Sequence, residues 1–222
     1  MIITKQGIAV IENDSHLSRW IEEHETLEVA EGFISLFREF IPRRGLVCDI
    51  GACLGDHTAT YSRFVGRIGS VHAFEPNPVA LECLLHNMHR YGNVTVHPVA
   101  LGAKEGKAGI QGNLNLGMAK ITEGNDISVD TLDNQSKGWA RLDFIKMDAE
   151  GYEPEILDGA KETLSRFSPV MLIEVNRPVL AQRGMTPADI YDRLSAMGYS
   201  YRPCEGHLGL DMDQIDVLCF KK

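Results

Sequence analysis

Short apolar runs alternate with segments of helical periodicity along most of the chain. The runs are too short for helices and predict buried strands, which we place at residues 46–50, 70–74, 93–99, 142–147 and 170–175. Apolar residues at helical spacing predict helices between them, which we place at residues 58–65, 78–88, 152–167 and 187–197. This alternation predicts an α/β fold with a doubly wound, mainly parallel sheet. Residues 199–203 and 214–222 predict a final strand pair, which adds an antiparallel strand near the C-terminus.

Residues 1–44 precede the first strand of this sheet, and we expect them to pack on it. Residues 2–11 alternate around Gly7 and predict a small hairpin, and helices should follow after Asn13 or Asp14 and over residues 30–41. Residues 45–222 then form the ligand-binding core. Because no linker rich in Pro, Gly or Ser separates the two parts, we expect a single compact domain overall.

The helix that Asn77 caps carries two sets of residues on different faces. Its predicted buried stripe is apolar and consists of Leu81, Leu84, Leu85 and Met88. Its other side carries potential metal ligands at i, i+3 and i+6, namely Cys83, His86 and His89. These fan across a wide face with no fourth ligand near in sequence, so we expect a solvated face rather than a metal site.

Composition narrows the classes of partner. The net charge of −9 disfavours a nucleic acid or an anionic membrane as partner. No apolar run reaches the length of a membrane span, and the N-terminus lacks the layout of a signal peptide. Five cysteines without paired spacing suit a reducing cytoplasm better than a disulfide framework. We therefore expect a cytoplasmic protein that acts on a small molecule.

The strand at 46–50 leads into the most informative stretch of the chain. Asp49 lies at its carboxyl end, Gly51 and Gly55 follow, and a helix begins soon after. This arrangement should present free backbone N–H groups at the sheet edge where α/β proteins bind ligands. A dinucleotide-binding loop would have a glycine where Cys53 stands, and a P-loop would need a Gly-Lys-Ser/Thr sequence that is absent. Asp49 would repel a pyrophosphate and fits a ligand with a cationic amino-acid portion.

The second strand ends in a carboxylate that suits a ribose. Glu75 lies 24 residues after Gly51, about where an acidic side chain binds the two ribose hydroxyls in related sheets. A cationic amino acid joined to a ribose describes S-adenosylmethionine. The alternative is a glycine turn and an acidic helix cap without any ligand.

Four segments resemble a known family. The turn at 49–58 is similar to motif I of class I methyltransferases, and residues 74–78 (Phe-Glu-Pro-Asn-Pro) to their second motif. Residues 129–133 (Val-Asp-Thr-Leu-Asp) and 142–153 (Leu-Asp-Phe-Ile-Lys-Met-Asp-Ala-Glu-Gly-Tyr-Glu) resemble the FkbM family. The resemblance spans roughly residues 14–175. It implies a Rossmann-like methyltransferase sheet, S-adenosylmethionine as cofactor and transfer to oxygen in sugars or natural products. Cys53-Leu54 replaces the Asn-Ile or Asn-Val more usual in the first motif, and Tyr152 adds a large polar ring.

We expect the turns at the sheet edge to hold the cofactor. The expected residues are Asp49, Gly51, Ala52, Gly55, His57, Thr58, Glu75, Pro76, Asn77, Ala100 and Asp148. His57 would contact the methionine carboxylate or act as a base; a position behind the site or facing solvent is the alternative.

Asp148, Glu150 and Glu174 are the expected catalytic residues. Asp148 and Glu150 follow the fourth strand, where they would support the sulfonium or accept the proton of a hydroxyl. Lys146 lies two residues upstream, so it points to the same side as Asp148 and would hold the acids ionised. The alternative is that these acids only cap the next helix.

Glu174 lies on the fifth strand, beside Asp148. With Asn176 and Asp148 it could bind a divalent ion such as Mg²⁺. We favour a hydrogen bond from Glu174 to substrate or to a backbone N–H, and we assign no metal ligands.

The pattern as a whole predicts an S-adenosylmethionine-dependent methyltransferase, acting on a hydroxyl of a sugar or small natural product. An NAD-binding oxidoreductase of similar fold and a non-catalytic methyltransferase-like binding protein are the alternatives. Loops at 102–126 and 203–213 would shape the acceptor side. Neither the acceptor nor the oligomeric state follows from the sequence.

Overall fold

Seven strands form the main sheet, in the order β11-β12-β10-β9-β3-β4-β5. The computed structural model describes residues 1–14, 17–29, 34, 37–111, 120–204 and 213–221. The strands are β3 (Leu46–Ile50), β4 (Ser70–Phe74), β5 (Val94–His97), β9 (Phe144–Met147), β10 (Val170–Asn176), β11 (Tyr199–Pro203) and β12 (Gln214–Lys221). β12 is antiparallel to both neighbours, and the pairs from β10 to β5 are parallel. The predicted α/β sheet with an antiparallel strand near the C-terminus is confirmed.

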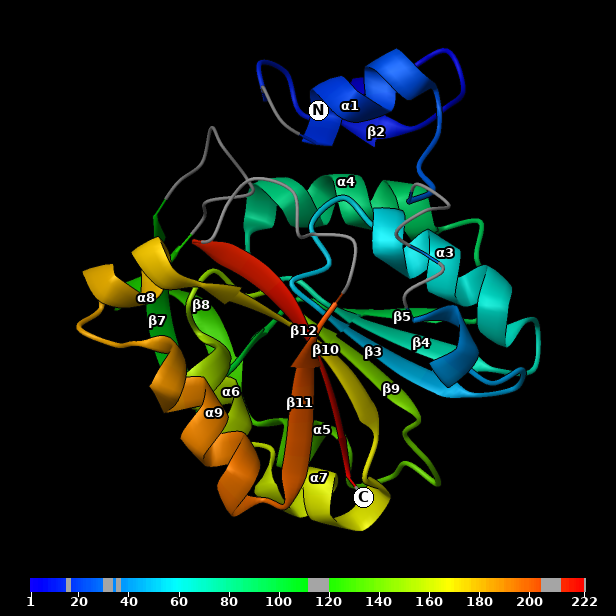
Figure 1. Cartoon of the computed structure of the whole chain (residues 1–222). Helices are drawn as coiled ribbons and strands as arrows, with labels where there is room; N and C mark the ends of the chain where they lie inside the picture. The colour runs from blue at the N-terminus through cyan, green and yellow to red at the C-terminus, as the bar shows by residue number, and fades with distance from the viewer. Residues whose placement is uncertain (15–16, 30–33, 35–36, 112–119, 205–212, 222) are drawn as a thin grey trace.

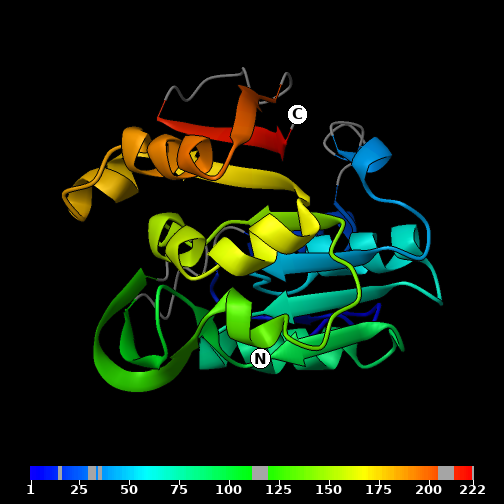
Figure 2. The same cartoon turned by 90° about the horizontal axis from the view of Figure 1, so that it is seen from below.

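Helices cover both faces of this sheet (Figures 1 and 2). One face carries α3 (Asp56–Val65) and α4 (Pro78–Met88). The other carries α5 (Leu132–Gln135), α6 (Glu153–Asp158), α7 (Lys161–Phe167) and α9 (Pro187–Ala196). A further short helix, α8 (Arg177–Gln182), follows β10. Neither α5 nor α8 was predicted, because each is too short to show helical periodicity.

Alternation along β3 assigns its side chains to the two faces. Leu46, Cys48 and Ile50 belong to the core under α6 and α7, whereas Val47 belongs to the core under α3. Since successive side chains of a strand point to opposite faces, Asp49 lies on the α3 side. The strand therefore buries a carboxylate beneath α3, at the carboxyl end of the sheet.

A second, three-stranded sheet follows β5. It consists of β6 (Ala100–Leu101), β7 (Gly106–Gln111) and β8 (Lys120–Asp130). The strand predicted at 93–99 ends at His97, and Ala100 and Leu101 pair with β8 instead. Pro98 explains the break, because proline has no N–H to donate to the ladder. The expected loop at 102–126 therefore contains β7 and the first part of β8.

The single helix predicted after Gly151 is wrong, because the structure contains two helices there. α6 ends at Asp158 and α7 begins at Lys161. The break allows the backbone of Gly159 to approach β6: a Cβ added at Gly159 would lie 2.0 Å from the Gly102 carbonyl oxygen. Close contact with the second sheet thus prevents one continuous helix.

The N-terminal hairpin and the helix after it are confirmed. β1 (Ile2–Ile3) pairs with β2 (Ala9–Val10), and α1 (Leu17–His24) and the 3₁₀ helix η1 (Arg38–Phe40) follow. Half of the helix expected over 30–41 lies outside the described residues, and Arg38–Phe40 within it form the 3₁₀ helix η1.

A buried asparagine joins the hairpin to the rest of the molecule. Asn87 Oδ1 accepts the N–H of Ala9 at 2.7 Å, and its Nδ2 donates to the carbonyls of Ala9 at 3.0 Å and Leu54 at 2.9 Å. One side chain of α4 therefore links β2 to the turn after β3.

The predicted orientation of α4 is wrong in part. Leu85 is 52% exposed, whereas Cys83 and Asn87 are fully buried. The helix turns these two residues toward the hairpin, which sequence periodicity alone does not reveal. No described helix is long and apolar enough to cross a membrane, and all five cysteines are free thiols.

Candidate active site

A cavity opens at the carboxyl ends of β3, β4 and β9. Its polar lining includes the carboxylates of Glu75, Asp148 and Glu150. Its apolar lining is formed by Ile50, Phe74, Val99, Leu101, Ile110, Ile121 and Ile156. The cavity thus combines a charged side with a surface suited to a flat apolar group.

The structure brings six of the expected residues to this cavity: Gly51, Glu75, Pro76, Ala100, Asp148 and Glu150. Asp49, Ala52, Gly55, His57, Thr58, Asn77 and Glu174 lie outside its lining. The sequence analysis did not identify Ile110 and Ile121 as lining residues. They come from β7 and β8 of the second sheet. Residues 102–126 show neither strand nor helix periodicity, so the sequence did not indicate a cavity wall there.

Gly51 lies where two turns touch. Its φ of +80° is in the left-handed region, and a Cβ there would lie 1.8 Å from the Asp148 carbonyl oxygen. Only glycine fits such an approach. The contact places the first turn directly against the end of β9.

The expectation of free N–H groups in this turn is wrong for three residues. Gly51 and Ala52 donate to the Phe74 carbonyl at 3.0 and 3.1 Å, and Cys53 donates to Glu75 Oε2 at 2.9 Å. The turn after β3 is therefore held by the turn after β4. Any ligand must rely on side chains more than on these amides.

Asp49 is fully buried beneath α3. Its Oδ2 accepts the Thr58 hydroxyl at 2.5 Å, while its Oδ1 is buried without a hydrogen-bond partner. Burial raises the pKa of Asp49. The Thr58 hydroxyl, in the first turn of α3, thus orients the Asp49 side chain.

Gly55 serves the packing of two helices. Its φ is +95°, and a Cβ there would lie 2.7 Å from Met88 Cε and 2.9 Å from Leu84 Cδ1. The absence of a side chain lets α3 begin close to α4. Sequence reasoning had placed this glycine beside the cofactor.

Glu75 joins the two turns that surround the cavity. Its Oε2 accepts from Cys53, and its Oε1 accepts the Asn77 N–H at 2.8 Å. Burial raises the pKa of Glu75 to about 7. Asn77 caps α4 by accepting the Val79 N–H at 3.0 Å, and its Nδ2 is buried without a partner.

The imidazole of His57 is mostly covered by the surrounding protein. Its Nδ1 lies 3.1 Å from the Tyr61 hydroxyl, and its side chain is 16% exposed. Burial, followed by the nearby Lys146 ammonium, lowers the pKa of His57 to about 4. The solvent-facing alternative for His57 is therefore wrong.

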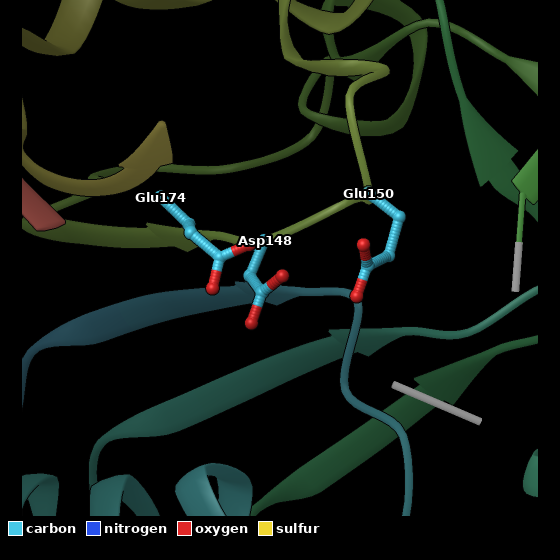
Figure 3. Close-up of side chains that lie close together, drawn as sticks. All are labelled: Asp148, Glu150 and Glu174. Carbon is cyan, nitrogen blue, oxygen red and sulfur yellow. The ribbon is translucent and has the colours of Figure 1, made fainter. Parts of the chain in front are cut away.

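Three carboxyl groups gather beside the cavity. Figure 3 shows Asp148 and Glu174 beside each other at the ends of β9 and β10, with Glu150 on the turn that follows β9. One oxygen from each of the three lies within 4.8 Å of the others. Gln214 donates its amide N–H to Glu174 Oε1.

The surroundings of Asp148 and Glu174 shift the pKa values of these two carboxyl groups in opposite directions. Lys146 Nζ lies 3.0 Å from Asp148 Oδ2, which confirms the predicted pair. Burial acts to raise the pKa of Asp148, but the Lys146 ammonium outweighs it and holds that pKa below the ordinary value. Burial, together with the carboxylates of Asp148 and Glu150, raises the pKa of Glu174 well above the ordinary value.

Other residues hold the turn that carries Glu150. Glu153 Oε1 accepts the N–H groups of Ala149 at 2.8 Å and Gly151 at 3.4 Å. Arg183 donates to the Gly151 carbonyl and forms an ion pair with Glu155. Sequence reasoning missed both, because the partners are backbone atoms or lie far apart along the chain.

The backbone N–H groups of Ala149 and Gly151, which precede α6, bind Glu153. They do not belong to the first turn of α6, so the role of Asp148 and Glu150 stays a prediction. Asn176 Oδ1 accepts the Val179 N–H at 3.3 Å and caps α8. The carboxylates that lie close enough together to share a cation are those of Asp148, Glu150 and Glu174.

Comparison with known protein families agrees with this geometry. The family model described as "Methyltransferase FkbM domain" matches residues 49–201, which is more than half of the chain. The chain belongs to the FkbM methyltransferase family. It is an S-adenosylmethionine-dependent methyltransferase, so the oxidoreductase alternative is overturned.

Solved structures share the fold of this FkbM methyltransferase. A methyltransferase FkbM from Methylobacillus flagellatus KT has a TM-score of 0.54 and 16% identity, with 96% of this chain and 64% of that chain covered. The O-methyltransferase TomG from Streptomyces achromogenes, involved in tomaymycin synthesis and solved with S-adenosylmethionine, has a TM-score of 0.55 and 14% identity over 97% of this chain and 92% of that chain. A putative methyltransferase from Streptococcus mutans, solved with S-adenosylhomocysteine, has a TM-score of 0.53 and 12% identity, with 87% of this chain and 99% of that chain covered. No curated protein sequence matches the FkbM methyltransferase described here.

Proposed function

We propose that this FkbM methyltransferase methylates a hydroxyl group of a sugar or small natural product. The observation that carries the proposal is the adjacent pair of Asp148 and Glu174, one ionised and one with a raised pKa, beside the cavity. A hydroxyl acceptor must lose its proton, and a carboxylate of raised pKa is a competent acceptor for it.

The residues present fit S-adenosylmethionine. Glu75 retains acceptor capacity for the ribose hydroxyls, since each carboxylate oxygen accepts more than one hydrogen bond. The apolar wall suits the adenine ring. Among the residues that the structure describes, Asp49 Oδ1 and Asn77 Nδ2 are a buried acceptor and a buried donor without partners, and both flank this edge of the sheet. Buried polar atoms are normally satisfied, so these two favour a polar ligand nearby.

Each carboxylate of the cluster then has its own role in the proposed reaction. When bound, S-adenosylmethionine supplies an electrophilic methyl group, and its carbon–sulfur bond breaks with the electron pair left on sulfur. Lys146 keeps Asp148 ionised, so Asp148 opposes the positive charge at that end of the cavity. Glu174, once ionised, accepts the proton of the acceptor hydroxyl as its oxygen forms the new bond to carbon. Glu150 orients the acceptor from the turn that follows β9.

A divalent ion is a second candidate partner of this cluster. Hard cations such as Mg²⁺ take carboxylate oxygens as ligands, and Asp148, Glu150 and Glu174 offer three. Lys146 already balances the charge of Asp148 at 3.0 Å. We therefore propose a reaction in which Glu174 accepts the proton without a metal ion.

Calorimetric titration and a transfer assay test the proposal together. We expect micromolar binding of S-adenosylmethionine and S-adenosylhomocysteine, unchanged by magnesium or by a chelator. Methyl-labelled cofactor should then modify acceptors with free hydroxyls and spare their fully O-methylated counterparts. Binding without transfer to any hydroxyl compound would favour the non-catalytic alternative. Transfer to the amine members of an otherwise matched panel alone would make nitrogen the acceptor atom, and loss of transfer with the chelator would establish the metal ion.

A further inference from the structure

A second cavity lies at the opposite edge of the sheet, at the amino ends of β3, β4 and β5. Its volume is about 660 Å³. Four arginines line it, and we call it the arginine cavity: Arg43, Arg63, Arg67 and Arg90. Ser62, Gly66, Tyr91, Gly92 and Asn93 complete its lining. No described lining residue is acidic, although the chain as a whole has a net charge of −9.

Three chain segments create this concentration of positive charge. Arg43 precedes β3, Arg63 and Arg67 belong to the end of α3 and the turn before β4, and Arg90 follows α4. Figure 1 shows this region where α3 and α4 finish, at the right of the sheet. A five-residue strand spans roughly 17 Å. The arginine cavity is therefore separate from the proposed methyl-transfer site at the other ends of the same strands.

The guanidinium groups are only partly engaged within the protein. Arg63 forms an ion pair with Glu28, and Arg90 donates to the Gly7 carbonyl at 3.0 Å. In the part of the chain that the structure describes, Arg43 and Arg67 form no side-chain hydrogen bond or ion pair. Two exposed guanidinium groups thus remain available to an external anion.

Capping of α3 does not explain why the arginines gather here. Cations are often placed at helix C-termini to meet the last carbonyl groups. Here the Asn93 amide donates to the carbonyls of Ser62 and Gly66, both at 3.1 Å, and the Arg44 N–H donates to that of Val65 at 2.8 Å. The carbonyls of Ser62, Val65 and Gly66 are therefore bound without any guanidinium group.

A close approach at Gly66 shapes the cavity floor. The residue has a φ of +71°, and a Cβ there would lie 3.3 Å from Arg43 Cζ. Glycine therefore leaves room for the Arg43 side chain to lie against the end of α3. This brings Arg43 beside Arg67 and the other basic residues of the lining.

We propose that the arginine cavity binds a small ligand carrying two linked phosphate groups, such as the diphosphate of a nucleotide. Guanidinium groups bind phosphate oxygens in pairs of hydrogen bonds, and several of them around one hollow match more than one phosphate. The cavity volume lies within the range of small-molecule sites. Half-buried Tyr91 offers an aromatic surface beside the charges. Because the cavity lies across the sheet from the carboxylates, the ligand acts as an effector or as an anchor and is not itself methylated there.

Calorimetry with inorganic pyrophosphate and uridine diphosphate tests this site directly. Neither probe contains adenine, so neither competes for a site that recognises adenosine. The key variant is Arg43→Gln/Arg67→Gln. The control, Arg19→Gln/Arg202→Gln, changes the net charge equally at exposed positions elsewhere. All three proteins should retain the same affinity for S-adenosylhomocysteine, which separates this test from that of the proposed function.

We expect both probes to bind the unmodified protein at low salt. The Arg43/Arg67 variant should lose at least about tenfold in affinity, and the control should change by less than about twofold. Absence of binding at millimolar probe, or equal losses in the two variants, would overturn the proposal. A short single-stranded oligonucleotide that binds more tightly than uridine diphosphate would also overturn it, in favour of a nucleic-acid partner.

Discussion

The side chain of Glu153 folds back over the turn that precedes it, and its Oε1 accepts the N–H of Ala149 at 2.8 Å. The same oxygen accepts the N–H of Gly151, and the Glu153 side chain is almost fully buried. This carboxyl group therefore organises the segment that carries both Asp148 and Glu150.

Replacement of Glu153 by alanine should destabilise the fold by about 2–3 kcal/mol, because two backbone donors lose their acceptor. Glu153→Gln keeps an oxygen in place and should cost less than about 1 kcal/mol. Urea denaturation at pH 7 measures both changes. Glu162→Ala on the exposed face of α7 serves as the control, and a loss of equal size in that variant would contradict the assignment.

Glu75→Gln should weaken binding of S-adenosylhomocysteine by about 1–3 kcal/mol, the usual contribution of a hydrogen bond to a charged group. The amide oxygen can still accept from Cys53, whereas the bond from the Asn77 N–H is lost, so the fold of the variant is checked by urea denaturation. Isothermal calorimetry measures the affinity, with Glu82→Gln on the exposed face of α4 as the control. Equal affinities in the two variants would remove Glu75 from the cofactor site.

The raised pKa of Glu174 predicts the pH dependence of turnover. Turnover should increase with pH above the ordinary carboxyl range, since only the ionised form of Glu174 accepts a proton. Glu174→Gln should lower kcat by about 10²–10⁴-fold and abolish this increase, while the affinity for S-adenosylhomocysteine stays within about threefold. Profiles of kcat against pH decide the point. An increase with pH that survives in the variant would assign the proton to another group.

A half-buried pair of histidines makes stability depend on pH. His72 Nδ1 lies 2.9 Å from His97 Nε2, and burial lowers the pKa of His72 to about 4. The unfolded chain, with a histidine pKa near 6.5, then binds more protons than the folded one, so stability should fall as the pH drops from about 6.5 to about 4.

His72→Gln should make this decline shallower by up to about 1.4 kcal/mol per pH unit, the contribution of one proton. Urea denaturation across this pH range measures the slope. His89→Gln, on the exposed end of α4, should leave it unchanged. Identical slopes for the two variants would show that His72 keeps its ordinary pKa.

Features that depend on local sequence were predictable. The run before Asp49 and the glycine after it produce β3 and its turn, and proline with Asn77 starts α4. Gly51 and Glu75 could be placed at one sheet edge because parallel strands present their carboxyl ends together.

Features that depend on the partner of each side chain were not predictable. Asn87 is a polar residue on a helix face and gives no sign that it binds Ala9, which lies 78 residues away. The apolar wall of the cavity likewise depends on how the second sheet folds over the first, which brings in Ile110 and Ile121. Periodicity records which positions are apolar, and not which element they meet.

The order of the strands has a consequence for how the molecule assembles. Among the described strands of the main sheet β11 pairs with β12 alone, and β12 lies between β11 and β10. α9 and β11 therefore have no attachment to the sheet through hydrogen bonds until residues 214–221, the later segment, have inserted against β10. We expect α9, β11 and β12 to form last and to unfold first. Their amide hydrogens should therefore exchange before those of β3 and β9. The part of the sheet that carries Asp49 and Asp148 can then stay folded while α9, β11 and β12 unfold.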